Sequence, residues 1–158
     1  MKRVLLLLVI SLFLGACSSS QKVVSKSVKP QTKAERIVSN ALNYKGVRYK
    51  FGGTTKRGMD CSGVIYVAFG EENFQMPRIS RDMAKRGKKI SLNTAKKGDL
   101  LFFKTPNSRR GINHVGLVVS NSRGQIQFIH ATSSRGVIVS SLSEKYWKKA
   151  FVKATKVL

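Results

Sequence analysis

The stretch at residues 60–69 reads DCSGVIYVAF, and Gly70 closes this apolar run. Aspartate is a favoured N-cap residue, so the stretch predicts a buried helix that begins directly after Asp60. The β-branched residues of the run would also suit a buried strand, and periodicity alone does not separate the two in a short apolar segment. The choice matters because a helix would place Cys61 at its N-terminus.

Helical signals dominate before residue 98 and strand signals follow it. A first helix is expected at residues 33–45, capped by Thr32 and ended by Gly46, because apolar residues recur at helical spacing there: Ala34, Ile37, Val38, Ala41 and Leu42. Residues 47–58 predict a shaped loop, and Ser80 is expected to cap a short helix that ends at Gly87. Runs between turn residues predict strands at residues 99–104, 113–120, 125–131, 136–141 and 150–157. This order predicts an α+β fold, with N-terminal helices packed on an antiparallel sheet.

The composition indicates one ordinary domain with a strongly positive surface. The chain has 158 residues, 30 of them Lys or Arg and 7 of them Asp or Glu, for a formal net charge of +23. A surface of this kind favours an anionic partner, which could be nucleic acid, a lipid surface or an acidic polymer.

The N-terminus has the features of an export signal. Lys2 and Arg3 precede an apolar run at residues 4–14 that is too short to span a membrane, and LGAC follows at residues 14–17. This end resembles the bacterial lipoprotein box. We therefore expect a signal peptide at residues 1–16, lipidation of Cys17, a flexible tether to residue 32 and the folded domain at residues 33–158. An ordinary secretory signal with a chance cysteine is the alternative.

Export reduces the classes of partner that the protein can meet, and it also bears on the role of Cys61. Nucleic acid becomes an unfavoured partner, whereas lipid headgroups and cell-wall anions become favoured ones. Lipidation of Cys17 would leave Cys61 without a disulfide partner in an oxidising compartment. At a helix N-terminus the pKa of the Cys61 thiol should fall, and nearby N–H groups could hold an oxyanion. The alternative is a small buried apolar residue.

The chain has two histidines, and both lie in predicted strands. On neighbouring strands, His114 could be the base for Cys61, and His130 could orient it. The alternatives are structural histidines, or a zinc site with Cys61. No CxxC or HxxxH pair accompanies them, so neither a metal nor a cofactor is expected.

Six short motifs occur in the order typical of one family. The chain resembles the NlpC-type papain-like cysteine peptidases of bacterial cell walls over residues 33–158. The motifs that carry the resemblance are Tyr49–Gly53, Asp60–Gly63, Pro77–Ser80, Gly98–Phe103, His114–Gly116 and Phe128–Ala131. The ending at Tyr146–Lys149, together with the lipoprotein box, is most similar to the Spr-like (MepS-like) outer-membrane murein endopeptidase lipoproteins.

The resemblance implies roles that the residues alone do not. It makes Cys61 the nucleophile, His114 the base and His130 the third residue, and it places the Tyr49 hydroxyl at the oxyanion. It assigns substrate binding to three residues, Ser62, Arg78 and Ser80, with Arg78 either supporting the pocket or meeting a substrate carboxylate. Ile79 and Met83 depart from the family pattern, which leaves the details of the pocket open.

The resemblance implies a peptidoglycan endopeptidase that cuts bonds from a D-amino acid to diaminopimelate, in peptide stems or in crosslinks. The protein is expected to be a monomer, held by its Cys17 lipid at the periplasmic face of the cell envelope, at the outer membrane. Two alternatives stay open. One is a peptidoglycan-binding lipoprotein without catalysis, and the other is an acyl transferase that uses the same Cys-His site.

Overall fold

The computed structural model describes residues 30–106, 108–109 and 111–158. The predicted signal peptide, Cys17 and nearly all of the predicted tether lie outside the described residues. The chain divides into two units, at residues 1–30 and 31–158, and the second unit is described below. In the part that the structure describes, no helix has the length and apolarity needed to cross a membrane.

Three helices cover one face of a sheet. Helix α2 (Lys33–Leu42) begins at a capping box in which Thr32 accepts from the Glu35 N–H group and Glu35 accepts from the Thr32 N–H group. After a small hairpin, formed by β1 (Thr54–Thr55) and β2 (Gly58–Met59), α3 (Cys61–Gly70) follows Asp60. The short helix α4 is Ser80–Met83. The predicted helix after Asp60 is therefore confirmed.

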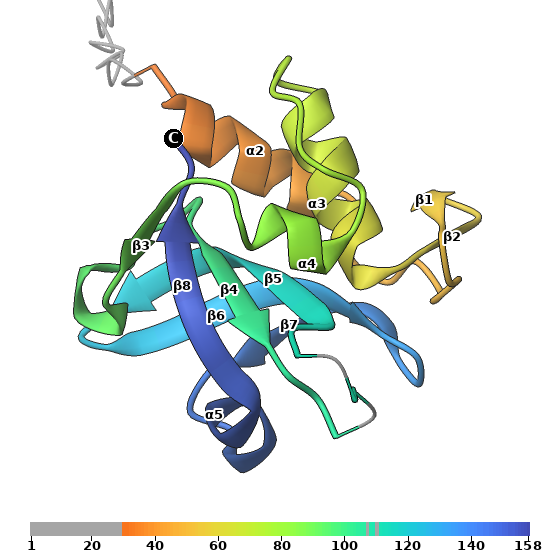
Figure 1. The fold of residues 1–158 in the computed structure, drawn as a ribbon. Coiled ribbons are helices and arrows are strands. Elements are labelled where there is room, and N and C mark those ends of the chain that lie inside the picture. The colour runs from red at the N-terminus through yellow and green to blue at the C-terminus, as the bar shows by residue number, and fades with distance from the viewer. Residues whose placement is uncertain (1–29, 107, 110) are drawn as a thin grey trace, which may run out of the picture. The chain divides into compact units, whose positions relative to one another are not determined.

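A six-stranded antiparallel sheet forms the rest of the unit, in the order β3-β8-β4-β5-β6-β7. Its strands are β3 (Lys88–Ile90), β4 (Leu100–Phe103), β5 (His114–Ser122), β6 (Gln125–Thr132), β7 (Gly136–Ser141) and β8 (Phe151–Lys156). The strands β4 to β7 form the predicted meander, whereas β8 returns to lie between β3 and β4. Figure 1 shows β8 crossing the sheet between its neighbours.

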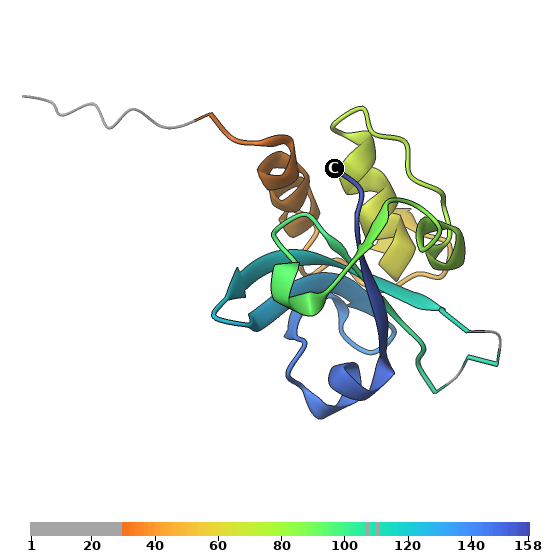
Figure 2. The ribbon, with the colours of Figure 1, turned by 60° about the vertical axis from the view of Figure 1, so that its left-hand side comes forward.

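The sheet is buried on both faces. Helices α2, α3 and α4 lie on one side and α5 (Lys145–Ala150) on the other, as both ribbon views show (Figures 1 and 2). Side chains of β4 alternate between the two cores, with Leu100 and Phe102 on the helix side and Leu101 and Phe103 on the α5 side. All four are fully buried, which explains why β4 reads as a continuous apolar run.

The α+β prediction is confirmed, with corrections to individual elements. Ser80 is the first residue of α4 and not its cap, because Ile79 holds the N-cap position without a side-chain hydrogen bond. That helix ends at Met83 rather than at Gly87. The sequence interpretation also missed α5, β3 and the 3-10 turn Leu92–Thr94. These elements are short, and their positions depend on contacts with distant strands.

Candidate active site

Cys61 is the first residue of α3, and a glycine loop packs tightly against that helix end. A Cβ atom at Gly63 would lie 2.0 Å from the Gly53 carbonyl oxygen, and one at Gly53 would lie 2.2 Å from the Gly58 oxygen. The Asp60 N–H group donates to the same Gly53 oxygen over 3.2 Å. Glycine at Gly53 and Gly63 thus permits the loop to approach the helix start that carries Cys61.

The carboxylate of Asp60 joins the helix start, the loop and an arginine. It accepts hydrogen bonds from the N–H groups of Gly63 at 2.6 Å and Gly52 at 2.8 Å. Arg78 donates to both carboxylate oxygens, over 3.0 and 2.9 Å, and its side chain is 31% exposed. Ser62 donates to Asp60 over 3.1 Å and accepts from Arg78 over 2.9 Å. This bidentate network holds Cys61 in place through its immediate neighbours.

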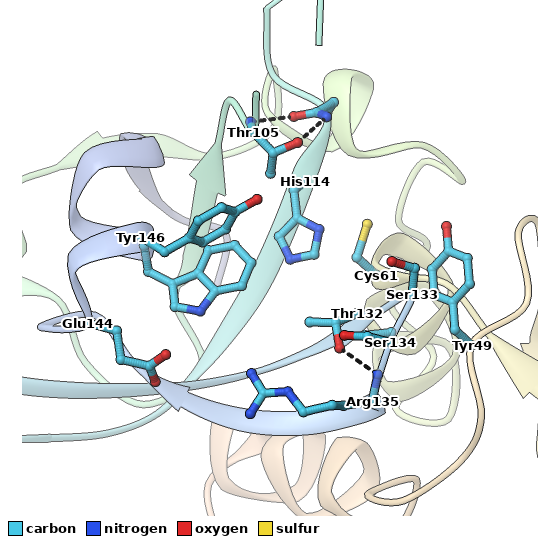
Figure 3. Close-up of a pocket in the computed structure, with 13 residues that line it drawn as sticks. Tyr49, Cys61, Thr105, His114, Thr132, Ser133, Ser134, Arg135, Glu144 and Tyr146 are labelled. Carbon is cyan, nitrogen blue, oxygen red and sulfur yellow. Dashed lines mark hydrogen bonds between the residues drawn. The ribbon is translucent and has the colours of Figure 1, made fainter. Parts of the chain in front are cut away.

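The two histidines come together because β5 and β6 are paired. His114 begins β5 and His130 lies near the end of β6, and His114 Nε2 lies 3.0 Å from His130 Nδ1. Since Nε2 of His114 is engaged there, Nδ1 is the ring nitrogen left for the cavity. Figure 3 shows the His114 ring beside the Cys61 sulfur, with Tyr49 on the far side of that sulfur.

The tautomers of the two rings follow from this hydrogen bond. For His114 to accept a proton at Nδ1, its own proton must reside on Nε2 and be donated to His130 Nδ1. His130 then carries its proton on Nε2, a buried atom without a hydrogen-bond partner among the described residues. His130 is fully buried, and burial lowers its pKa to about 2, so the ring is neutral.

Burial keeps both Cys61 and His114 uncharged at neutral pH. The pKa of Cys61 is raised to about 11, chiefly by burial and to a smaller extent by the charge of Asp60, while the N–H groups of Val115, Ser62 and Cys61 act to lower it. Burial lowers the pKa of His114 to about 4, and Asp60 opposes that change. The expectation that the Cys61 pKa falls is therefore wrong: N–H groups at the helix start do lower it, but desolvation outweighs them.

Trp147 completes the wall behind the histidines and was not singled out for the site from the sequence. The indole is 5% exposed and stacks on His114 with centroids 5.1 Å apart. It also meets His130 edge to face at 4.6 Å, while Phe128 stacks on His130 at 4.7 Å. The pair of histidines thus lies in an aromatic box. Basic residues flank Trp147 in the sequence and α5 was not predicted, so no sequence signal indicated that the indole is buried.

Two cavities meet at Cys61. The first has a volume of about 410 Å³ and is lined by Tyr49, Cys61, Thr105, Asn113, His114, Ala131, Thr132, Ser133, Ser134, Arg135, Glu144, Tyr146 and Trp147. The second has a volume of about 420 Å³ and is lined by Tyr49, Phe51, Gly52, Asp60, Cys61, Ser62, Arg78, Ile79, Ser80 and Asn113. Tyr49 borders both, and burial raises the pKa of its hydroxyl, with smaller contributions from the charges of Cys61 and Asp60.

The structure places the three predicted substrate-binding residues, Ser62, Arg78 and Ser80, in the second cavity. Both terminal nitrogens of Arg78 already bind Asp60, a geometry that suits support of the pocket better than contact with a substrate. Ile79 lines the same cavity and is 44% exposed. Met83 is fully buried in the core and is not among the described residues that line either cavity.

The zinc alternative concerned Cys61, His114 and His130. Within residues 30–158, apart from positions 107 and 110, no group of three or more His, Cys, Asp or Glu side chains is arranged to hold a metal ion. Cys61 is a free thiol that is partly exposed.

Comparisons with known proteins show which family this chain resembles. The sequence pattern described as the NlpC/P60 family matches residues 46–156. The chain is 33% identical to the Escherichia coli K12 murein DD-endopeptidase MepS/murein LD-carboxypeptidase, a match that covers 94% of this chain and 88% of that protein. It is 34% identical to the probable endopeptidase NlpC of the same strain, over 98% of this chain and 99% of that one.

A solved structure gives the same fold. It is a Staphylococcus aureus Mu50 protein described as similar to a lipoprotein of the NLP/P60 family, with a TM-score of 0.70 and 29% identity. The match covers 88% of this chain and 46% of that one, so this chain spans just under half its length.

Proposed function

This chain belongs to the NlpC/P60 family, and from that premise we propose that it is a cell-wall endopeptidase acting on peptidoglycan. The bond cut would join a D-amino acid to diaminopimelate, in a peptide stem or in a crosslink. The 3.0 Å contact between His114 and His130, beside Cys61 at the start of α3, is the observation that carries the proposal. A thiol, a base and a group that orients the base are the parts that nucleophilic acyl transfer needs.

In the proposed mechanism, Cys61 is the nucleophile and His114 is a general base. Nδ1 of His114 takes the thiol proton as the sulfur attacks the carbonyl carbon of the substrate. His130, neutral throughout, holds the His114 ring through Nε2. His114 then gives its proton to the leaving amine, and a thioester remains on Cys61. Water, activated by the same nitrogen, hydrolyses that thioester.

The oxyanion would be stabilised by the backbone N–H group of Cys61 and by the hydroxyl of Tyr49. The raised pKa of Tyr49 keeps its proton in place as a hydrogen-bond donor at neutral pH. Tyr49→Phe should therefore lower kcat by about tenfold to a hundredfold, with a small effect on KM, since the missing donor acts only after attack. Steady-state kinetics on a purified muropeptide would measure both parameters.

We further propose that the chain is exported and anchored in the cell envelope. Residues 1–16 would be removed and Cys17 lipidated, and residues 17–32 would tether the monomeric domain at the periplasmic face of the outer membrane. The lipoprotein box at residues 14–17 supports this. Fractionation of cells that express the full chain tests it: the wild-type protein should sediment with the outer membrane and Cys17→Ala should not.

The decisive experiment is fragment analysis. Purified protein is incubated with sacculi, and the soluble products are identified by mass spectrometry. New peptide ends at diaminopimelate are expected, and they should vanish in Cys61→Ala and in His114→Ala. Binding to sacculi without new fragments would indicate a wall-binding module. Products joined to an added amine in place of water would indicate an acyl transferase. Fragments that persist in Cys61→Ala would refute the mechanism.

A further inference from the structure

The position of His114 gives the two cavities different roles. The base must hand its proton to the leaving amine, so that amine has to lie on the His114 side of Cys61. The first cavity is lined by both Cys61 and His114, whereas His114 is not among the described residues that line the second. The acyl half of the substrate therefore belongs in the second cavity, and the amine half belongs in the first.

Arg135 is the arginine that lines this amine-side cavity. It lies in the turn between β6 and β7 and lines the cavity with an exposed side chain. Its backbone N–H group donates to Thr132 over 3.2 Å, but its guanidinium has no hydrogen bond or ion pair among the described residues. Figure 3 shows the guanidinium reaching across the cavity on the His114 side, away from Tyr49.

The acidic residue of this cavity already has a partner. Glu144 accepts a hydrogen bond from the Ser141 N–H group over 2.9 Å, and no ion pair joins it to Arg135 within the described residues. The charge of Arg135 acts on His130, whose pKa it helps to lower. The cavity thus presents one unpartnered cation close to the point where the amine leaves, and its planar donors suit a carboxylate.

We propose that Arg135 binds the free carboxylate of the diaminopimelate residue that supplies the leaving amine. This inference rests on the proposed function and names what the amine-side cavity selects. Diaminopimelate has two amino-acid ends, and the carboxylate of the D-configured end is free in stems and in crosslinks. Lysine has the same chain without that carboxylate. Arg135 therefore makes the enzyme prefer diaminopimelate to lysine at this position.

The test compares two muropeptides that differ only in diaminopimelate or lysine at the position that supplies the amine. The readout is the ratio of their kcat/KM values. The wild-type protein should favour diaminopimelate by about tenfold, at the low end for a hydrogen bond between charged groups because Arg135 is exposed. In Arg135→Gln the ratio should fall to near one, through a loss on the diaminopimelate substrate alone. Any effect through His130 would act on both substrates and cancel in the ratio.

Arg123→Gln is the matched control. Arg123 is an exposed arginine in the turn after β5, about 30 Å along that strand from His114. This variant loses the same charge and should keep the wild-type ratio. A wild-type ratio near one, or an Arg135→Gln ratio equal to that of the wild type, would overturn the inference and leave the proposed function standing. If the wild-type protein cuts neither substrate, both proposals fall.

Discussion

Titration of Cys61 gives the sharpest test of how this site works. The pKa of the thiol is raised to about 11 and that of His114 is lowered to about 4, in both cases chiefly by burial. Between these values the resting pair is a thiol and a neutral imidazole. By simple titration, roughly one molecule in 10,000 carries a thiolate at pH 7 and about 1% do at pH 9, because the thiolate fraction falls tenfold for each pH unit below the pKa.

Two measurements check these protonation states and the thiolate fraction. The ultraviolet absorbance of the thiolate, taken against Cys61→Ala, should stay flat from pH 5 to pH 9. The rate of alkylation by iodoacetamide should rise about tenfold per pH unit over the same range, since only the thiolate reacts. His114→Ala should give the same two curves, because His114 does not set the thiol pKa in the free enzyme.

A thiolate–imidazolium pair would give the opposite results. Thiolate absorbance would be present at pH 7, alkylation would be nearly independent of pH, and both would change in His114→Ala. Any of these results would refute the general-base mechanism. The pH dependence of activity follows from the same pKa values. His114 is neutral above its pKa of about 4, so kcat should stay constant from pH 5 to pH 9. Activity should fall as the pH drops through 4, because the base then takes up a proton.

Three other predictions concern the support of the site and the charge of the surface. Gly63→Ala should lower the free energy of unfolding in urea by about 2 to 3 kcal/mol, because its Cβ would meet the Gly53 oxygen at 2.0 Å; Gly70→Ala, in the same helix with no heavy atom within 4 Å, should not lower it. Asp60→Asn should lower the free energy of unfolding by about 2 kcal/mol, because it leaves the partly buried Arg78 guanidinium without its charge partner. Adding Arg78→Met should recover part of this loss, and strictly additive losses in the double-mutant cycle would contradict the network. Added salt should weaken binding of the inactive Cys61→Ala protein to sacculi, given the large excess of basic over acidic residues, and unchanged binding would exclude an electrostatic contribution.

Much of the fold could be predicted because its signals are local. The N-cap at Asp60, the helical spacing of residues 33–42 and the turn residues between β4 and β7 are each contained in a few consecutive positions. The β-branched content of α3 argued for a strand, but a helix packed on the sheet buries those side chains equally well. The place of β8 between β3 and β4 has no local signal, since it depends on a pairing between segments about fifty residues apart.

The sequence by itself determined the chemical types present and their order along the chain: one free thiol in the predicted domain, two histidines on neighbouring strands and the glycines beside them. Only the tertiary structure decided the protonation of Cys61 and His114 and the burial of Trp147 against both histidines. It also decided that the exposed side chain of Arg135 lines the first cavity. The physical reason is that periodicity and capping act between near neighbours. Desolvation and charge act through space, and they depend on which distant segments the fold brings around a side chain.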